Sequence, residues 1–490
     1  MADLGPVRVR FAPSPTGYLH VGGARTALYN FLFARKHGGQ FILRIEDTDR
    51  TRYVPDSVQD IMESLRWLGI EWDEGPDKGG PVGPYVQSER VEIYRKLAHQ
   101  LVETGHAYRC FCTPERLQQL RELQRKMGLR TGYDRRCRNL SPEEIEKNLA
   151  EGKPYVIRLK VPLEGETVFQ DYLRGEIRYD NRELEDIILL KSDGFPTYHL
   201  ANVIDDHLMQ ITHVLRADEW IPSTPYHVLL YRAFGWEPPV FAHLPVILSP
   251  DGKGKLSKRH GATAVREFRE QGYLPEALVN FLALLGWSPG DDREILSLDE
   301  MIQAFDLKRV GKRGAVFDYQ KLQWMNGEYI RRLPPEELYR RALPFMERAG
   351  LVKTPKDREK FRKIVPLLQE RVKTLGEFPY AAEYFFREVE TYDEKGLKKH
   401  LKNPEILDHL AELRNRLAAL ETFDKDSIEQ TLRGLAQELG IGAGKLIHPT
   451  RLALTGRTFG PGLFELMEVL GKETCIRRLD RFIEKFRHAS

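Results

Sequence analysis

The chain has 490 residues, 41% of them hydrophobic and 30% charged, and a formal net charge of +3. This length is enough for about three to five compact units with buried cores. No apolar run is long enough to span a bilayer and the first residues lack the apolar region of a signal peptide, so membrane and secreted proteins are disfavoured and a cytoplasmic protein is expected.

The first predicted element is a strand over residues 7–11, followed by a Pro/Gly turn and a helix that opens at Gly22 and runs to about His37. In such an arrangement backbone N–H groups and the positive helix end face an incoming phosphate. His20 can donate a hydrogen bond to a phosphate oxygen, and Gly22 and Gly23 leave room for a flat base against the backbone. The segment therefore favours a nucleotide site.

A strand over residues 41–44 and an amphipathic helix ending near Gly69 come next, and complete the βαβ beginning of a parallel sheet. We assign residues 1–88 to the first half of a Rossmann-like domain. Residues 89–189 have a sequence pattern different from that of the flanking segments and are interpreted as an α/β insertion. Apolar strands resume at 187–190 and 213–216, and residues 190–250 are assigned to the second half of the domain.

Three of the four cysteines, Cys110, Cys112 and Cys137, lie in the predicted insertion. Zinc prefers four N, S or O ligands in a tetrahedron, so these thiols are candidates for a structural metal site far from catalysis. The alternative is three buried or free thiols without a metal. Four cysteines in a chain of this length do not make a disulfide framework.

A second glycine-flanked segment contains Lys255, Ser257, Lys258 and Arg259. A mobile cationic loop of this kind can close over a triphosphate, whereas an ordinary solvated basic loop is the alternative. Residues 251–330 are assigned to this loop and the region that follows it.

After residue 331 the pattern is helical throughout, with helices predicted near 334–341, 358–368, 404–420 and 462–485. Pro379 is the predicted boundary between two helical units, 331–378 and 379–490. Residues 308–371 contain 17 Lys and Arg against 8 Asp and Glu, a local charge of +9. This stretch could face a polyanion, or it could be a solvated helix surface balanced by nearby acids.

Several motifs occur in a fixed order along the chain: Ala12–Gly17 (Ala-Pro-Ser-Pro-Thr-Gly), His20–Gly23 (His-Val-Gly-Gly), Arg44–Arg50 (Arg-Ile-Glu-Asp-Thr-Asp-Arg), Pro196–Asn202, Arg216–Trp220, Lys255–Arg259 (Lys-Leu-Ser-Lys-Arg) and Lys321–Asn326. Together they resemble the class I aminoacyl-tRNA synthetases, with His20–Gly23 standing for the "HIGH" element and Lys255–Arg259 for the "KMSKS" element. More closely, nearly the whole length resembles the bacterial glutamyl-tRNA synthetases.

The resemblance implies a fold and a reaction. The fold is a Rossmann-like catalytic domain with an inserted domain that grips the tRNA acceptor end, a stem-contacting region, and an all-α half with two anticodon-binding units. The reaction joins L-glutamate to tRNA-Glu through a glutamyl-adenylate, with Mg²⁺ held mainly by ATP. A monomer, and a requirement for bound tRNA before glutamate activation, are also expected. No covalent enzyme nucleophile is needed, so catalysis must come from positioning and charge stabilisation.

By the same resemblance the site residues fall into three sets. Catalysis is assigned to His20, Lys255 and Lys258. ATP binding is assigned to Gly17, His20, Gly22, Gly23, Glu219, Trp220, Lys255, Ser257 and Lys258. Glutamate binding is assigned to Arg10, Ala12, Ser14, Glu46, Tyr198, Asn202 and Arg216.

The chemistry of the glutamate set agrees with this assignment. Glu46 can pair with the α-ammonium group, and Arg10 and Arg216 can hold carboxylate oxygens. The alternatives are an ordinary salt bridge at a strand edge for Arg10, a surface loop for Glu46 and a core position for Tyr198.

The resemblance also supplies candidates outside the pocket. Arg371, Arg451 and Thr455 are expected near the anticodon, where Arg371 would discriminate a base of tRNA-Glu from that of tRNA-Gln; a solvated arginine and a helix cap are the alternatives. For zinc, the fourth ligand of the family pattern would fall on Asn139, a poor ligand, so Tyr133 is the candidate instead.

Other functions remain possible at this point. Glutaminyl-tRNA synthetases carry β-barrel anticodon domains, which the helical pattern after 331 does not support. A catalytically silent tRNA-binding protein and a nucleotidyltransferase of the same superfamily are further alternatives, the first opposed by the intact His20, Lys258 and Arg216. Arg371 favours an enzyme strict for tRNA-Glu over one that also acylates tRNA-Gln.

Overall fold

The computed structural model describes residues 5–487. The chain forms two compact units. We call them the mixed unit, Met1–Glu267 with Leu278–Asp318, and the helical unit, Phe268–Ala277 with Tyr319–Ser490. Among the described residues, none of the helices is long and apolar enough to cross a membrane.

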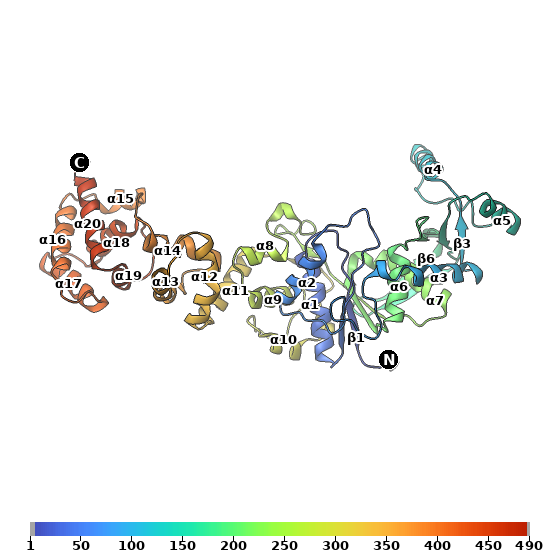
Figure 1. The fold of residues 1–490 in the computed structure, drawn as a ribbon, viewed down its shortest axis with the longest axis horizontal. Coiled ribbons are helices and arrows are strands. Elements are labelled where there is room, and N and C mark those ends of the chain that lie inside the picture. The colour runs from blue at the N-terminus through green and yellow to red at the C-terminus, as the bar shows by residue number, and fades with distance from the viewer. Residues whose placement is uncertain (1–4, 488–490) are drawn as a thin grey trace. The chain divides into compact units, whose positions relative to one another are not determined.

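The mixed unit begins with the predicted βαβ arrangement (Figure 1). Strand β1 (Arg8–Phe11) pairs in parallel with β2 (Gln40–Leu43), and α1 (Val21–Lys36) connects them. Helix α1 begins one residue earlier than predicted because His20 caps it, and the chain turns toward β2 through Gly38, whose φ of 62° lies in the left-handed region that favours glycine. Helix α2 (Ser57–Trp67) follows.

A four-stranded sheet of order β6-β5-β9-β8 supports the middle of the unit. Its strands are β5 (Glu166–Asp171), β6 (Gly175–Asp180), β8 (His213–Ala217) and β9 (Val240–Leu244). Strand β9 is parallel to both β8 and β5, whereas β5 and β6 form an antiparallel hairpin. Helices α6 (Tyr198–Leu208) and α7 (Thr224–Phe234) pack on one another.

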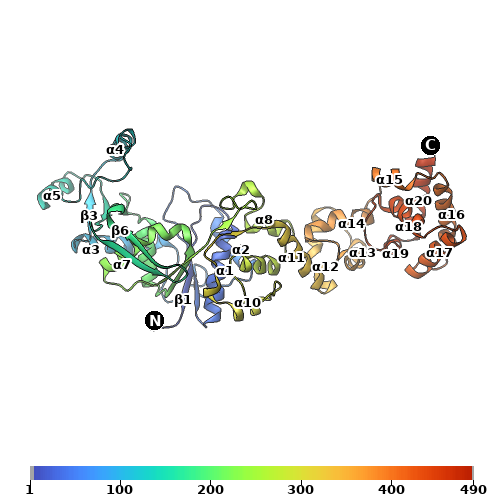
Figure 2. The ribbon, with the colours of Figure 1, turned by 180° about the vertical axis from the view of Figure 1, so that it is seen from behind.

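The predicted insertion contains a second, antiparallel sheet made of β3 (Ala107–Cys110), β4 (Val156–Leu159) and β7 (Ile188–Leu190). Its helices are α3 (Val91–Glu103), α4 (Pro114–Lys126) and α5 (Pro142–Ala150). Strands β5 and β6 also lie within residues 89–189, yet they join the sheet of β8 and β9 (Figure 2). The limits of the six segments remain a prediction.

The rest of the mixed unit contains a short parallel pair, β10 (Ile247–Leu248) and β11 (Ala315–Val316), and α10 (Leu298–Ala304). Helices α8 (Val265–Glu270) and α9 (Pro275–Leu284) each belong partly to both units. Short 3-10 helices are η1 (Gln87–Glu89), η2 (Asn181–Glu183), η3 (Asp218–Ser223), η4 (Lys258–His260), η5 (Leu307–Arg309) and η6 (Leu375–Glu377).

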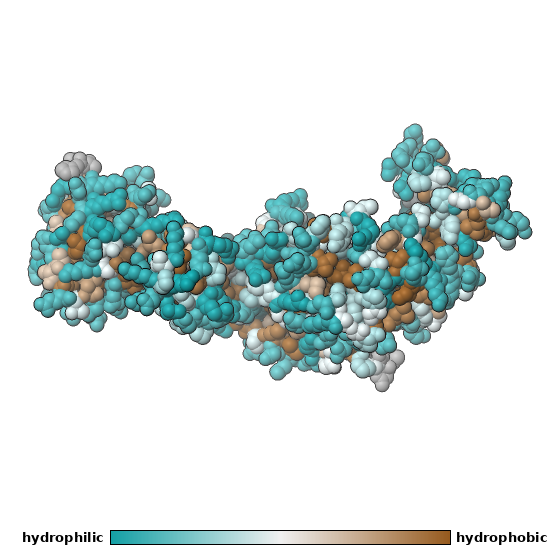
Figure 3. All heavy atoms as spheres, viewed as in Figure 1, coloured by the Kyte–Doolittle hydropathy of each residue, from teal (hydrophilic) through white to brown (hydrophobic). Residues whose placement is uncertain are grey.

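The helical unit is built on one continuous apolar core. Its helices are α11 (Tyr319–Arg332), α12 (Pro335–Arg348), α13 (Pro355–Leu368), α14 (Phe378–Phe386), α15 (Glu394–His400), α16 (Glu405–Ala418), α17 (Lys425–Glu438), α18 (Gly444–Thr455), α19 (Leu463–Leu470) and α20 (Lys472–Arg487). On the face shown in Figure 3, hydrophilic residues cover most of this unit, with smaller apolar patches among them. The predicted fold class, α/β followed by all-α, is confirmed.

One predicted helix is wrong in its extent. Residues 462–485 form two helices rather than one, because Gly471 between them has a φ of 86°. A helix residue has a negative φ, so the chain changes direction there.

Candidate active site

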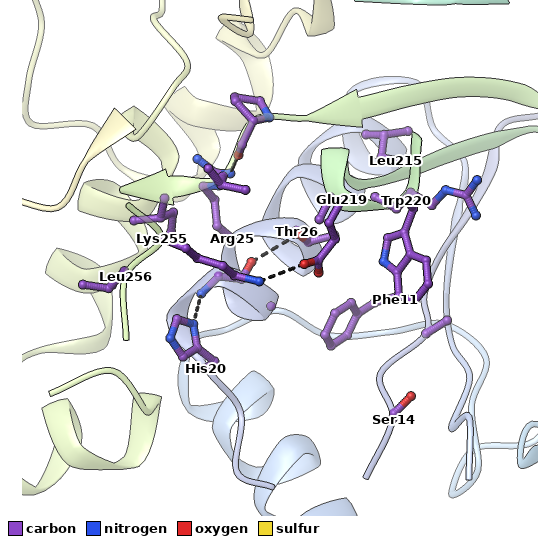
Figure 4. A pocket seen from close by; sticks show the side chains of 18 of the residues that line it. Phe11, Ser14, His20, Arg25, Thr26, Leu215, Glu219, Trp220, Lys255 and Leu256 are labelled. Carbon is purple, nitrogen blue, oxygen red and sulfur yellow. Dashed lines mark hydrogen bonds and ion pairs between the residues drawn. The ribbon is translucent and has the colours of Figure 1, made fainter. Parts of the chain in front are cut away.

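A pocket of about 550 Å³ opens beside β1, β8 and the start of α1 (Figure 4). Most of the residues proposed from the sequence line it: Arg10, Ala12, Ser14, His20, Gly22, Gly23, Glu46, Tyr198, Arg216, Glu219, Trp220, Lys255, Ser257 and Lys258. Gly17 lies in the turn between β1 and α1, outside the lining. Asn202 is buried behind the pocket on α6, where its Oδ1 lies 3.5 Å from an Arg216 nitrogen.

His20 stands at the first turn of α1 with a defined tautomer. The backbone N–H of Gly22 donates to His20 Nδ1 at 2.9 Å, so the proton of a neutral ring must sit on Nε2. Burial, aided by the charges of Lys255 and Lys258, lowers the pKa of His20 below its usual value. A neutral imidazole with a free N–H donor is suited to hold a phosphate oxygen without adding another full charge.

The cationic loop faces His20 across the pocket. Lys255 pairs with Glu219 at 2.9 Å, the contact drawn in Figure 4, and both side chains are exposed. Lys258 begins η4 and is exposed, and the side chains of Ser257 and His260 cap this short helix reciprocally. The loop thus brings two lysines to the same opening as the positive end of α1.

Arg216 is a buried cation, 4% exposed, whose described partners are all neutral. Its Nε donates to His243, and one terminal nitrogen donates to Tyr198 Oη at 3.1 Å. The other terminal nitrogen donates to Thr224 and His227, at 3.0 and 3.1 Å. The described residues place no carboxylate within ion-pairing distance of it. A buried guanidinium in such surroundings lacks a counter-charge, so the site favours an anionic ligand.

Arg10, by contrast, already has a counter-charge. Its guanidinium forms two hydrogen bonds to Asp206, at 2.9 and 3.0 Å, and both side chains are buried. Arg44, also buried, donates to the same carboxylate at 2.8 Å. Arg10 therefore forms the kind of salt bridge that the alternative named, although a buried one, and much of its charge is matched from behind the pocket.

Glu46 is 5% exposed, so the surface-loop alternative is wrong. Its Oε2 accepts from Gln87 at 2.9 Å and from Arg44 at 3.3 Å. Burial raises the pKa of Glu46 to about 7, although Arg44 and Arg10 oppose the shift. A pocket carboxylate whose negative charge is only partly compensated by nearby cations is suited to receive an ammonium group.

Two aromatic rings cover one wall of the pocket. The rings of Tyr198 and Trp220 are stacked with centroids 4.2 Å apart. Tyr198 is half-buried and lines the pocket as well as contacting Arg216, so it is not only a core residue.

Sequence reasoning did not single out several residues that support this site: Arg25, Gln87, Asp171, Asp206, Thr224, His227 and His243. Arg25 lies in an otherwise apolar stretch of α1 and donates to the carbonyl oxygen of Leu285 at 2.8 Å. A charged residue on a buried helix face was a usable signal. The other residues of this set contact the site from segments that are distant in the sequence, and no local sequence pattern indicates such contacts.

The three cysteines of the insertion are brought together. Their sulfur atoms all lie within 4.8 Å of one another, with 3.6 Å between Cys112 and Cys137. Tyr133 Oη lies 3.2 Å from the Cys110 sulfur and 3.5 Å from that of Cys112, whereas Asn139 is exposed. Tetrahedral zinc with bonds of about 2.3 Å sets its sulfurs about 3.8 Å apart, so the three thiols could hold a metal of that geometry.

The candidates in the helical unit lie in a separate group. Arg371 is exposed, and Arg451 is half-buried with a hydrogen bond to the carbonyl of Pro461 at 2.7 Å. Thr455 is buried at the end of α18, where its hydroxyl donates to the Arg451 carbonyl four residues back and accepts from the Arg457 N–H; the cap of the helix is Gly456.

Aromatic side chains that the sequence analysis did not single out are exposed in the same unit. Tyr380 and Phe459 are 62% and 60% exposed, and Arg457 stacks on Tyr380 at 3.9 Å. Exposed rings beside guanidinium groups form a stacking surface suited to unpaired bases.

The basic stretch 308–371 is partly balanced by acids. Within the helical unit, Arg340 and Arg341 both pair with Glu337, and Arg341 also pairs with Glu276. Arg358 pairs with Glu347, and Arg362 with Glu336. Part of the local charge is therefore a solvated and compensated helix surface, as the alternative proposed.

Both the sequence and the fold of the chain are similar to those of known proteins. Residues 6–324 match the model for the catalytic domain of class I tRNA synthetases (E and Q), and residues 337–483 match an anticodon-binding domain. The chain is 51% identical to a glutamate–tRNA ligase of Moorella thermoacetica over 481 residues, covering 98% of each chain. A glutamate–tRNA ligase of Roseiflexus castenholzii is 53% identical over 488 residues, covering 98% of this chain and 96% of that one.

A solved structure is similar over almost the whole chain. The crystal structure of a glutamate–tRNA ligase from Elizabethkingia meningosepticum, in complex with its amino acid, has a TM-score of 0.90 and 44% identity, covering 98% of this chain and 99% of that one. The family match, the identities and the coverage agree, and the chain therefore belongs to the glutamate–tRNA ligase family of class I aminoacyl-tRNA synthetases.

Proposed function

We propose how this chain carries out the reaction of its family, the ATP-dependent attachment of glutamate to tRNA. The glutamate α-carboxylate attacks the α-phosphorus of ATP and displaces pyrophosphate, and a terminal ribose hydroxyl of the tRNA then attacks the activated carbonyl and displaces AMP. Neither step needs an enzyme nucleophile, so the pocket acts by binding, orientation and charge stabilisation.

The observation that carries the proposal is the buried Arg216 with neutral partners. A carboxylate of L-glutamate supplies the missing counter-charge, and Glu46, which lines the same pocket, receives the α-ammonium group. Glutamine carries a neutral amide at the same place and would leave the guanidinium buried without a counter-charge, which disfavours it. Tyr198 and Asn202, both bonded to Arg216, orient the carboxylate-binding nitrogens.

Nucleotide binding is assigned to the start of α1 and the cationic loop. His20 presents Nε2–H to a phosphate oxygen, and Gly22 and Gly23 leave the backbone accessible to the adenosine, which packs beside Trp220. Lys255 and Lys258 neutralise the charge that develops on the leaving pyrophosphate. Mg²⁺, held mainly by the ATP oxygens, supplies further neutralisation of the phosphates.

We assign tRNA selection to the helical unit. The exposed Arg371 and the stacking surface of Tyr380, Arg457 and Phe459 are suited to unpaired anticodon bases. A guanidinium forms two directed hydrogen bonds to a base edge, so Arg371 is the proposed discriminator between tRNA-Glu and tRNA-Gln.

The cysteine cluster is proposed to hold structural zinc through Cys110, Cys112, Cys137 and Tyr133. Metal analysis of the protein by mass spectrometry should give about one zinc per chain, and Cys137→Ser should lower both this content and the melting temperature. Wild-type protein that is purified without chelators, is stable and contains no zinc would contradict the assignment.

Aminoacylation of separate tRNA-Glu and tRNA-Gln transcripts tests the whole proposal, with labelled glutamate or glutamine and ATP. Charging of tRNA-Glu with glutamate alone is expected. If glutamate is attached to both tRNAs, the proposed reaction is supported and the proposed role of Arg371 in discrimination is contradicted. Absence of any charging would favour a silent tRNA-binding protein, and a pyrophosphate-exchange assay without tRNA would identify another adenylyl transfer.

A further inference from the structure

Three neighbouring strands place one ionisable side chain each in a row that ends at the pocket. Strands β8 and β9 are parallel, with Arg216 and His243 as direct partners in the register. Strand β5 pairs with β9 where Asp171 faces Phe241, two residues before His243. Asp171, His243 and Arg216 are 3%, 0% and 4% exposed, so the row runs through the interior of the sheet.

The carboxylate of Asp171 is fixed by four donors. Its Oδ2 accepts from the Nδ1 and from the backbone N–H of His243, at 2.6 and 3.0 Å. Its Oδ1 accepts from the backbone N–H groups of Leu173 and Arg174, at 2.9 and 3.0 Å. Burial disfavours the charge, but these hydrogen bonds, first that of His243, hold the pKa of Asp171 below its usual value. The group is therefore an ionised acceptor that cannot rotate.

This carboxylate determines which nitrogen of His243 carries the proton. Because Nδ1 donates to Asp171, Nε2 of the neutral ring has a lone pair, and Arg216 Nε donates to it at 3.1 Å. Burial lowers the pKa of His243 to about 4, so the ring is neutral near pH 7. The opposite tautomer would direct an N–H at the N–H of Arg216, and the guanidinium would lose one of the contacts that hold its plane.

We infer that Asp171 and His243 are positioning residues that orient Arg216 for the carboxylate of glutamate. The inference rests on the proposed function of Arg216 and extends it to a strand of the predicted insertion. Asp171 and His243 do not line the pocket, whereas Arg216 does. Their effect must therefore pass through His243 Nε2, which contacts Arg216 directly at 3.1 Å and also contacts Thr224, a partner of Arg216, at 3.2 Å. Outer carboxylates orient histidine ligands of metals in a similar way.

Asp171→Asn is the first variant. The amide keeps the size of the side chain but can place an N–H donor against His243 Nδ1, which favours the wrong tautomer. We expect the KM for glutamate to rise about 10- to 100-fold, the range found when a group that orients a ligand is lost, with the KM for ATP nearly unchanged. Glu176→Gln is the matched control, because Glu176 lies on the adjoining strand β6 and is exposed.

A pair of substitutions at His243 separates positioning from packing. His243→Gln can keep an acceptor near the place of Nε2, whereas His243→Leu has a similar volume and no acceptor. Positioning predicts that the Leu variant has the higher KM for glutamate and that the Gln variant recovers most of the loss. It also predicts that the preference for glutamate over glutamine falls in the Leu variant, since both substrates would suffer equally from a general loss of packing.

Each variant should also be titrated with a non-hydrolysable glutamyl-adenylate analogue that retains the γ-carboxylate, so that binding is measured without turnover. The inference is overturned if Asp171→Asn matches Glu176→Gln, if the KM values for ATP and glutamate rise together, or if the Gln and Leu variants are equivalent. If Asp171→Asn melts below the assay temperature, the comparison of His243→Gln with His243→Leu decides the inference instead. Wild-type protein that binds the analogue and charges no tRNA would instead refute the proposed function, and the analogue titrations would still decide this inference.

Discussion

Arg216 in the pocket of the mixed unit and Arg371 in the helical unit are both cations, but the protein holds them in different ways. Arg216 is 4% exposed and its guanidinium donates to neutral acceptors on several elements of the fold. Arg371 is exposed, and so are Tyr380 and Phe459 of the stacking surface in the same unit.

The difference indicates two kinds of recognition. A buried cation with a fixed plane selects one small anion of matching geometry, because water and salt do not screen it. An exposed cation contributes to binding of a large polyanion, where each contact is weak and depends on ionic strength.

Loss of the buried cation should have the largest effect. Breaking one partner of a buried charge interaction costs about 2–5 kcal/mol, so Arg216→Met should lower kcat/KM for glutamate by about a thousandfold in steady-state aminoacylation. Arg216→Lys keeps the charge and loses the planar set of donors, and an intermediate loss is expected. Neither loss should depend on salt between low and moderate ionic strength.

Arg178→Met is the control for this experiment. Arg178 lies on β6 of the same unit, is exposed, and pairs with Glu166 and Glu176 at the surface. Its loss should leave kcat/KM near the wild-type value. If Arg216→Met retained most of its activity with glutamate, the buried guanidinium would not be the carboxylate site.

The second effect concerns turnover rather than affinity. Lys258→Ala should lower kcat by about a hundredfold, the usual loss when one transition-state donor is removed, and leave the KM for glutamate within a few-fold of wild type. Lys253→Ala is a matched control on the same loop, since Lys253 is also exposed. A change in the glutamate KM alone would place Lys258 in ground-state binding.

The contrast between the regions also explains what the sequence could predict. Pocket residues that belong to short contiguous motifs, such as His20, Gly22 and Lys258, could be identified from the sequence. The order of these motifs along the chain is what indicated the site. The groups that support these residues could not be identified in this way: Asp206 binds Arg10 across 196 positions, and Asp171 reaches His243 across 72. Those pairings depend on strand order, in particular on β5 joining β9, which local periodicity does not encode.

The helical character of the second half was predicted, and α13 and α16 were located closely because their apolar spacing is long and regular. Helices α14, α15, α17 and α18 were not predicted individually. The error at Gly471 has a physical reason. A glycine inside an apolar periodic pattern is compatible with both a continuous helix and a break, and only its φ in the fold decides between them. The exposed rings Tyr380 and Phe459 carried no periodic signal at all.

Arg371→Ala should have a smaller and salt-dependent effect. One lost contact to a base edge is worth about 1–3 kcal/mol, so we expect the KM for tRNA-Glu to rise about tenfold at low salt and the preference over tRNA-Gln to weaken. The slope of affinity against salt concentration should also decrease. Arg332→Ala is a comparison variant for general charge, because Arg332 is likewise exposed at the end of α11. Equal effects of the two variants would assign Arg371 to nonspecific attraction.

The smallest predicted effect is a pH dependence at Glu46. Burial raises the pKa of Glu46 to about 7, with Arg44 and Arg10 opposing the shift and Asp206 and Asp205 adding to it. Only the ionised form attracts the substrate ammonium, so affinity for glutamate should rise about threefold between pH 6.5 and 7.5, as the ionised fraction does. Calorimetric titration with the adenylate analogue measures this, and Glu46→Gln should bind more weakly with a flat profile.

The stability of the fold should change with pH in the opposite direction to the affinity for glutamate, over a lower pH range that overlaps the first. This separates the effect on stability from the effect on binding. Between the ordinary pKa of a glutamate, 4.5, and about 7, the folded state holds a proton on Glu46 that the unfolded state has lost. The contribution of Glu46 to stability therefore falls as pH rises through this window. If the affinity for the analogue increases with pH while the melting temperature falls, the increase cannot come from a more stable fold, so it must reflect ionisation within the pocket. An affinity that is flat or falls with pH would show that Glu46 does not bind the ammonium group.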